Sequence, residues 1–258
     1  MIRIAVVTHK EYELPEDPLY LPVWAGAALS PVIPGEYLRD DSGDNISDRN
    51  GLYSELTALY WLWKNYDDIC PGADTAGICH YRRYFAAGND KTAGILKASD
   101  AERLIKPGEI VLPEARNYVI ESNYSQYVHA HHAADLLATR DVIGERHPGY
   151  LSSFDRRMAL RKGHRFNMFI MPRADLDSYC SWLFDILFEL EDRLDTTGYE
   201  GRDRRVLGLV SERLLDVWLD ANGASYTELP YIMTEREHLA LKAIGLAGRK
   251  VRAIIKTE

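Results

Sequence analysis

The stretch GICHYRRYF, residues 77–85, carries the most information about this chain. Its apolar start is typical of a buried β-strand, and His80, Arg82 and Arg83 follow at the expected C-terminal end of that strand. Open α/β sheets bind ligands in the crevice at the carboxyl ends of their strands. Guanidinium groups suit phosphate oxygens, and a histidine can donate or shuttle a proton. The stretch therefore predicts a cationic cleft for an anionic ligand.

The segment before this strand favours the same interpretation. An isolated Arg-Arg pair is more often the exposed end of an ordinary strand, so the context decides. Residues 40–47, DDSGDNIS, favour turns and caps, and Asn50 is a candidate helix N-cap. Apolar side chains then recur at helical spacing up to about residue 65: Tyr53, Leu56, Tyr60 and Trp63. We expect a polar loop, a helix with core-packed aromatic residues, the strand and the cleft, in that order.

A second strand end is predicted near the N-terminus. Residues 2–7, IRIAVV, form a short apolar run with β-branched residues, which suits a strand buried in a parallel sheet. Thr8, His9 and Lys10 follow at its C-terminal end. Lys10 could reach a phosphate, and Thr8 or His9 could bond a base or ribose. Any one of them alone is more simply a polar loop residue, but together they favour a nucleotide site.

Several segments in one order resemble a known protein family. They are GDNIS at 43–47, the asparagine at 50, YSELTALYWLWKN at 53–65 and GICHYRRYF. This order resembles the signature of a bacterial family of exopolysaccharide and capsule proteins first catalogued as a domain of unknown function, family 4422. Its best understood relative is the galactofuranosyltransferase module of a two-domain O-antigen galactan polymerase. Further matches extend the resemblance over most of the chain.

The resemblance implies a small GT-A-like, Rossmann-like α/β fold with a central mixed, mostly parallel sheet. Residues 1–238 would form one glycosyltransferase domain, with a nucleotide-sugar half at 1–112 and a helical acceptor half at 113–238. The implied reaction moves a hexose, galactofuranose first, from a UDP-sugar to a hydroxyl of a cell-surface polysaccharide or lipid-linked glycan. Alternatives are a UDP-galactopyranose or other UDP-hexose transferase with a Mg or Mn site, or a non-catalytic scaffold of polysaccharide assembly.

The cationic strand end suggests how the leaving group is stabilised. Many GT-A enzymes hold a divalent metal with an Asp-x-Asp motif at this place, whereas this chain carries His80, Arg82 and Arg83. Fixed cations there would stabilise the departing UDP without a metal, and we expect no cofactor beyond the UDP-sugar co-substrate. The alternative is a Mg²⁺ or Mn²⁺ site built from the loop carboxylates Asp40, Asp41 and Asp44.

An inverting transfer needs a carboxylate to take the proton from the acceptor hydroxyl. The predicted base is Glu212, with Ser211 as the N-cap of the following helix and Glu212 in its first turn. The simpler alternative is a glutamate that only favours its helix dipole or pairs with Arg213. Asp203 and Asp44 are the reserve candidates.

The other predicted contacts are divided between donor and acceptor. Asp44 and Asn45 join the nucleotide-binding group, because they lie in the signature loop. Aromatic, amide and hydroxyl side chains suit sugars. The predicted substrate contacts are Tyr81, Tyr124, His164, Asn167 and Arg205. A zinc site at His129, His131 and His132 is the weaker interpretation, because no further ligand follows at a suitable spacing.

Composition limits the remaining classes of function. The formal net charge of −8 over 258 residues argues against nucleic-acid binding. No apolar run approaches the roughly 20 residues that span a bilayer, and no targeting segment is evident, which favours the cytoplasm. The three cysteines, Cys70, Cys79 and Cys180, are expected to be reduced. The basic, amphipathic tail at 239–258 could lie on the inner face of the cytoplasmic membrane or dock on a partner glycosyltransferase.

Overall fold

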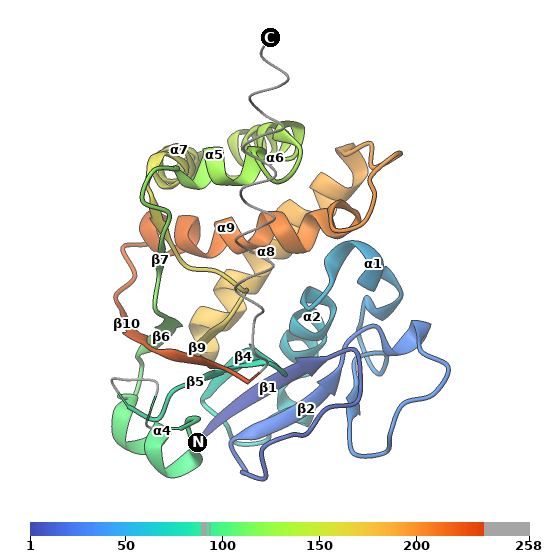
Figure 1. The fold of residues 1–258 in the computed structure, drawn as a ribbon, viewed down its shortest axis with the longest axis vertical. Helices are drawn as coiled ribbons and strands as arrows, with labels where there is room; N and C mark the ends of the chain where they lie inside the picture. The colour runs from blue at the N-terminus through green and yellow to red at the C-terminus, as the bar shows by residue number, and fades with distance from the viewer. Residues whose placement is uncertain (89–91, 93, 235–258) are drawn as a thin grey trace.

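Figure 1 shows a layered α/β arrangement in the computed structural model, which describes residues 1–88, 92 and 94–234. Strands from early and late parts of the chain form one central sheet in the order β10-β6-β9-β4-β1-β2-β3, with β5 beside β4 and β11 beside β5. A separate two-stranded sheet pairs β7 with β8. The strands are β1 (Ile2–Thr8), β2 (Tyr20–Trp24), β3 (Leu38–Arg39), β4 (Thr75–His80), β5 (Arg83–Phe85), β6 (Ile110–Pro113), β7 (Arg116–Asn117), β8 (Lys162–Gly163), β9 (Phe169–Pro172), β10 (Tyr226–Leu229) and β11 (Tyr231–Met233).

The predicted mixed, mostly parallel sheet is confirmed. β1 pairs in parallel with β2 and β4, β2 with β3, and β6 with β10. β9 is antiparallel to both β4 and β6, so β4 and β6 point the same way. Only β9 and β5 therefore oppose the common direction among the described strands of this sheet.

Helices cover both faces of the sheet, and alternate residues of each strand meet them. Ala5 and Val7 belong to the apolar cluster formed with α2, α8 and α9, whereas Ile4 and Val6 belong to the opposite cluster, which includes residues of α4. A further layer of α5, α6 and α7 packs on α8 and α9 (Figure 1). The helices are α1 (Asn50–Tyr53), α2 (Leu56–Lys64), α3 (Tyr66–Ile69), α4 (Ala98–Leu104), α5 (Asn123–Val128), α6 (Ala133–Arg146), α7 (Leu151–Ala159), α8 (Arg173–Arg193) and α9 (Val206–Ala221). Short 3-10 helices are η1 (Ala27–Leu29), η2 (Ser47–Arg49), η3 (Pro148–Tyr150) and η4 (Asp203–Arg205).

The stretch at 77–85 is a hairpin rather than one strand. β4 ends at His80, the chain turns at Tyr81 and Arg82, and β5 returns antiparallel with Arg83 opposite His80. β1 lies parallel to β4 with Val7 opposite His80. The predicted strand ends therefore share one edge of the sheet, and the reversal holds the two arginines there.

The helix expected from residue 50 to about 65 is broken in two. α1 ends at Tyr53, Ser54 has a φ of 51°, and α2 begins at Leu56. A positive φ is uncommon for a residue with a side chain and ends the helix. Asn50 is not the predicted N-cap but the first residue of α1, and its side-chain amide donates to the Ser54 carbonyl at 2.7 Å. Glu55 therefore lies between α1 and α2, outside both helices.

Asp40 holds the early loops together. Its side chain is fully buried and accepts hydrogen bonds from the backbone of Gly26 and Ala27 at 2.9 Å each, from the Thr57 hydroxyl at 2.6 Å and from the Ser47 hydroxyl. A carboxylate has about four acceptor positions, so these four donors fill them. Asp40 is thus a structural residue without capacity left for a metal ion.

We expect Asp40→Ala to lower the free energy of unfolding by about 3 kcal/mol, because it leaves several buried donors without partners. Asp41→Ala is the matched control: Asp41 pairs with the exposed side chain of Arg39, and such pairs contribute at most about 1 kcal/mol. Urea unfolding measures both. Equal losses for the two variants would contradict the structural role of Asp40.

Two expectations from composition concern the wider chain. Cys70, Cys79 and Cys180 are buried and free, as expected. Within the described residues, no helix has both the length and the apolar character needed to cross a bilayer. The predicted amphipathic tail at 239–258 lies outside the described residues.

Candidate functional site

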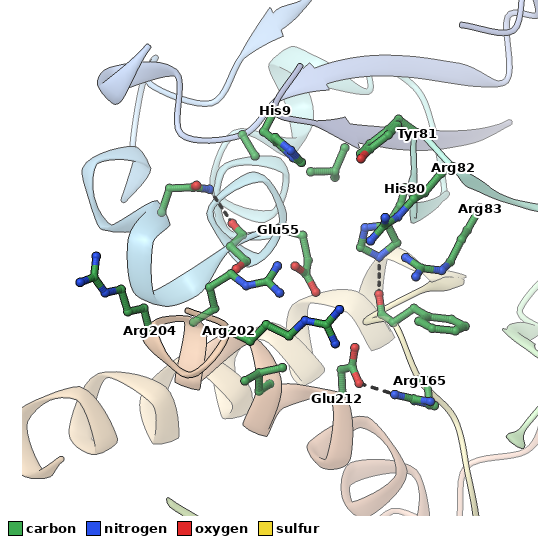
Figure 2. Close-up of a pocket in the computed structure, with 18 of the residues that line it drawn as sticks. His9, Glu55, His80, Tyr81, Arg82, Arg83, Arg165, Arg202, Arg204 and Glu212 are labelled. Carbon is green, nitrogen blue, oxygen red and sulfur yellow. Dashed lines mark hydrogen bonds and ion pairs between the residues drawn. The ribbon is translucent and has the colours of Figure 1, made fainter. Parts of the chain in front are cut away.

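A cavity of about 840 Å³ lies at the carboxyl edge of β1 and β4. The sheet edge forms one wall, and α1, η4 and α9 form the opposite wall (Figure 2). The cavity is large enough for a nucleotide-sized ligand. It lies where the sequence predicted the cleft, at the crevice of an α/β sheet.

The lining of this cavity is strongly cationic. Its described residues include eight arginines and only two carboxylates, Glu55 and Glu212. This excess of positive charge occurs in a protein whose formal net charge is −8. Three segments far apart in the sequence supply most of it, so folding concentrates the charge. The arginines are Arg82, Arg83, Arg116, Arg165, Arg202, Arg204, Arg205 and Arg213.

The turn after β4 supplies the predicted residues His80, Tyr81, Arg82 and Arg83 to the lining. The guanidinium of Arg83 lies 4.2 Å from the centre of the Phe166 ring, which holds it in a cation–π contact. His80 Nε2 contacts the Phe166 carbonyl oxygen, and burial lowers the pKa of His80 to about 4. His80 is therefore neutral at pH 7, and the positive charge of this turn comes from the arginines.

The end of β1 contributes two of its three predicted residues. Thr8 and His9 line the cavity, whereas Lys10 is absent from the lining. The Thr8 hydroxyl donates to the Lys10 carbonyl at 2.5 Å and so fixes the turn after the strand. The ammonium of Lys10 lies 4.9 Å from the centre of the Tyr81 ring. Lys10 thus contacts the neighbouring strand end beside the cavity.

Glu55 is a functional candidate that the sequence analysis missed. It follows the strained Ser54 and lies in the cavity wall, partly accessible there and otherwise surrounded by protein. The Asn167 amide donates to Glu55 Oε1 at 2.7 Å. Asn167 is in turn oriented, because its Oδ1 accepts from the Ser211 hydroxyl at 3.0 Å and its Nδ2 donates to the Gly208 carbonyl at 3.2 Å. The carboxylate is therefore held in one place.

Backbone strain is concentrated around Glu55. Four described non-glycine residues have positive φ, and three of them flank this site: Ser54 at 51°, Phe166 at 78° and Asn167 at 48°. Such conformations cost on the order of 1–3 kcal/mol each and persist where the surrounding structure enforces them. They gather at sites where geometry matters for function. Strain from two separate chain segments thus meets at one carboxylate.

The environment of Glu55 also changes its titration. The pKa of Glu55 is raised from the ordinary value of 4.5 to about 7, mainly by burial and to a smaller extent by the negative charge of the nearby Glu212. The hydrogen bond from Asn167 and the charge of Arg205 act in the opposite direction. A carboxyl group with a pKa near the working pH is suited to accept a proton from a substrate.

Glu212 lies in the same cavity, but not at a helix start. α9 begins at Val206, so Ser211 and Glu212 lie in its middle, and the predicted N-cap and first-turn position were wrong. Gly208 also lies inside this helix, where an added Cβ would come within 3.2 Å of the Tyr53 carbonyl oxygen. Glu212 lies 3.8 Å from Arg165 and 3.5 Å from Arg213. Figure 2 shows Glu55 and Glu212 entering the cavity from opposite sides.

The remaining predicted contacts are distributed over several places. Arg205 lines the cavity, and Asn167 acts behind it through Glu55. Asp44 accepts from the Tyr60 hydroxyl at 3.1 Å in the loop before α1. His164 lies in a second cavity, where its Nδ1 is 2.6 Å from Asp216. The exposed Tyr124 and the half-buried Asn45 are not among the lining residues.

The predicted alternative metal ligands are engaged with other side chains. Asp41 pairs with Arg39, and the reserve base Asp203 lies 2.6 Å from His131. His129 contacts Glu121, away from His131. No group of three or more His, Cys, Asp or Glu side chains among the described residues has the arrangement of a metal site. The cavity lining, rich in guanidinium groups, suits an anion rather than a divalent cation.

Comparisons with known proteins identify two similarities. The model of a protein family described as a domain of unknown function, DUF4422, matches residues 3–223. Among solved structures, the apo structure of the WbbM bifunctional glycosyltransferase is similar, with a TM-score of 0.82 and 26% sequence identity. The similarity covers 91% of this chain and 45% of that chain, so this chain spans less than half the length of that protein. No curated protein matches.

Proposed function

Because the chain belongs to the DUF4422 family and its fold matches that of a bifunctional glycosyltransferase, we propose that it is itself a glycosyltransferase. The proposed reaction moves a hexose from a UDP-sugar to a hydroxyl of a cell-surface polysaccharide. Galactofuranose is the first donor sugar to test, since the family resemblance of the signature segments points to it. The match over residues 3–223 confirms that resemblance.

The arginine-rich cavity is the observation that carries this proposal. When a sugar leaves a nucleoside diphosphate, negative charge grows on the phosphate oxygens. Preorganised cations at that position stabilise the transition state by a few kcal/mol per interaction. Arg82 and Arg83 are held at the sheet edge, and Arg205 and Arg213 approach from the helical side. A neutral sugar alone would not require such a concentration of positive charge.

We assign the role of general base to Glu55. In the proposed step the acceptor oxygen forms a bond to the anomeric carbon, and the bond from that carbon to the phosphate oxygen breaks. The electron pair leaves with UDP, and the acceptor proton passes to the Glu55 carboxylate. Attack opposite to the leaving group inverts the anomeric centre. Asn167 orients the carboxylate for this transfer.

Glu212, predicted from the sequence, is the second candidate for the base. It lies 3.8 Å from Arg165 and 3.5 Å from Arg213, which suits a residue that orders the arginines. Its negative charge also raises the pKa of Glu55. We therefore propose that Glu212 positions the cationic wall and tunes Glu55. Replacing Glu55 and Glu212 by glutamine, one at a time, shows which of the two is the base.

Metal independence remains part of the proposal. A divalent ion in this cavity would have two carboxylates at most among the described lining residues, against eight guanidinium groups. The positive guanidinium groups would repel a divalent cation in this cavity. The arginines would then neutralise the diphosphate in its place.

The test is a UDP-release assay with UDP-galactofuranose, UDP-galactopyranose and UDP-glucose, each with EDTA or with added Mn²⁺, in the presence of galactan oligosaccharides. We expect release with UDP-galactofuranose that EDTA leaves unchanged. Release restored only by Mn²⁺ would reject metal independence. UDP binding without turnover on any acceptor would favour a scaffold, and hydrolysis of a free oligosaccharide by water would favour a glycosidase.

A further inference from the structure

The short helix η4 and the residue before it carry positive charges that no carboxylate neutralises. Arg202, Arg204 and Arg205 all line the arginine-rich cavity. Arg204 donates from Nε to the Tyr199 carbonyl at 3.3 Å. Within the described residues, neither Arg202 nor Arg205 forms a hydrogen bond or an ion pair through its side chain. Two guanidinium groups without a counter-charge therefore lie in the cavity wall.

Arginines on the outer surface of this protein are commonly paired with carboxylates. The chain has 39 acidic residues against 31 lysines and arginines, so partners are plentiful. The absence of a partner at Arg202 and Arg205 is therefore a feature of this part of the cavity wall and not of the surface in general. Examples of paired arginines are Arg39 with Asp41, Arg140 with Asp155, Arg146 with Asp185, Arg156 with Asp220, Arg173 with Asp67 and Arg193 with Glu145.

The carboxylate that follows Arg202 in the chain is held away from it. Asp203 Oδ1 lies 2.6 Å from His131 Nδ1, and Asp203 Oδ2 lies 3.4 Å from His132 Nε2. The other nearby acid, Glu200, is exposed, does not line the cavity and forms no ion pair with a described residue. The acids of this segment thus leave the positive charge of the cavity wall available to a ligand.

The unpaired arginines lie on the acceptor side of the proposed reaction. Figure 2 shows Arg202 on the side of the cavity formed by η4, and Arg83 on the far side, beside His80. The positive charge of Arg205 reaches Glu55, where it acts to lower the pKa of the carboxyl group. In an inverting transfer the attacking hydroxyl and the leaving group are on opposite faces of the sugar. With the diphosphate at Arg83 and the base at Glu55, the unpaired arginines adjoin the acceptor.

We propose that Arg202 and Arg205 bind a negatively charged group of the acceptor, a carboxylate or a phosphate close to the hydroxyl that is glycosylated. This inference rests on the proposed function and narrows its acceptor to an anionic sugar. Guanidinium groups bind both kinds of anion through paired, charge-assisted hydrogen bonds. A neutral acceptor would displace water from two charges without supplying a counter-charge, which costs free energy.

The test is calorimetric titration of the full chain in saturating UDP, which fills the diphosphate position. The three probes are methyl galactoside, methyl galacturonide and galactose 1-phosphate, which carry no charge, a carboxylate and a phosphate. We expect the better anionic probe to bind about ten- to a hundredfold more tightly than the neutral one. Tighter binding of the galacturonide would identify the group as a carboxylate, and tighter binding of galactose 1-phosphate would identify it as a phosphate.

Arg202→Gln and Arg205→Gln should each reduce this preference about tenfold or more, because glutamine can donate a hydrogen bond but carries no charge. Arg204→Gln is the matched control and should keep the preference, since Arg204 comes from the same segment but points away from the carboxylates in Figure 2. All three side chains are exposed, so the variants should fold. Thermal unfolding checks this.

Equal binding of the neutral and anionic probes would overturn the proposal. Displacement of the anionic probes by UDP would also overturn it, because one site would then serve both anions. UDP release from UDP-galactofuranose tests the proposed function separately. Release on a neutral galactan together with equal binding of the probes would leave the transferase function standing without an anionic acceptor. Preferential binding of the anionic probes without UDP release on any acceptor would leave the anion site standing without the transferase function.

Discussion

Replacing Glu55 by glutamine should lower kcat of the proposed transfer by about 10²- to 10⁴-fold. The glutamine side chain keeps the size of Glu55 and can still accept the hydrogen bond from Asn167, but it cannot take a proton. Rates measured from pH 5 to 9 check the same assignment in the unchanged enzyme. Because the base must be ionised, kcat should rise with pH to a plateau, with a midpoint near the Glu55 pKa of about 7.

The same variant should be more stable than the unchanged protein at high pH. The pKa of Glu55 is raised from 4.5 to about 7 on folding, so the contribution of this group is favourable below pH 4.5 and is lost as pH rises through about 7. Glu55→Gln removes that loss. We expect a gain on the order of 1–3 kcal/mol at pH 8 and almost none at pH 4.5. Thermal unfolding at the two pH values measures it.

Glu212→Gln is the control for the assignment of the base. Since Glu212 raises the pKa of Glu55, its loss should move the midpoint of the rate profile to lower pH while turnover persists. If Glu212→Gln abolished turnover and Glu55→Gln retained it, the base would be Glu212, as the sequence first suggested. A combination of lost activity and gained stability in Glu55→Gln is not expected of a merely structural residue.

The ends of the strands could be predicted from the sequence because their signals are local. Apolar runs with polar residues directly behind them located the edges of β1 and β4, and the parallel register then placed Val7, next to Thr8, opposite His80. The hairpin at Tyr81 and Arg82 was missed, because no glycine, proline or asparagine marks that turn. The local sequence pattern therefore predicted where the cavity lies, but not the hairpin that forms part of its wall.

Glu55 was missed because its position depends on tertiary structure. The helical period runs through Ser54 without interruption, and only packing breaks the helix there. Gly208 fits closely against the Tyr53 carbonyl, which brings α9 against α1. α9 begins at Val206, so Glu212 lies inside a helix rather than at its start. Neither the break nor the close approach has a signature in one sequence.

Most of the arginines of the cavity were equally hidden. Arg165 follows the predicted strand-end motif by some eighty residues, and Arg202 and Arg213 come from a different segment again. Each is unremarkable alone, since an arginine is usually a surface residue. Their convergence becomes visible only when the chain is folded. This convergence is what makes the charge of the cavity wall a stronger indication of ligand than the Arg82-Arg83 pair.

Arg83→Ala should lower kcat/KM for the UDP-sugar by about 10²- to 10³-fold, a loss of some 3–4 kcal/mol of transition-state stabilisation. The guanidinium is held over the Phe166 ring at the sheet edge, where charge would develop on the leaving diphosphate. Arg83→Lys should recover only part of the rate, because lysine keeps the charge and loses the planar fork of donors. Calorimetric titration with UDP should show weaker binding for both variants.

Arg204→Ala is the matched control, since Arg204 comes from the same cationic lining but its guanidinium points away from the carboxylates in Figure 2. It should lose little of the rate, because an exposed charge is screened by water and salt. Thermal unfolding of each variant must show an intact fold before the rates are compared. Equal rates for Arg83→Ala and the unchanged enzyme would mean that the strand-end arginine does not face the leaving group. A selective loss at Arg83, at constant stability, would place the diphosphate at the carboxyl edge of β4, where the sheet, the hairpin and the Phe166 ring together fix one cation.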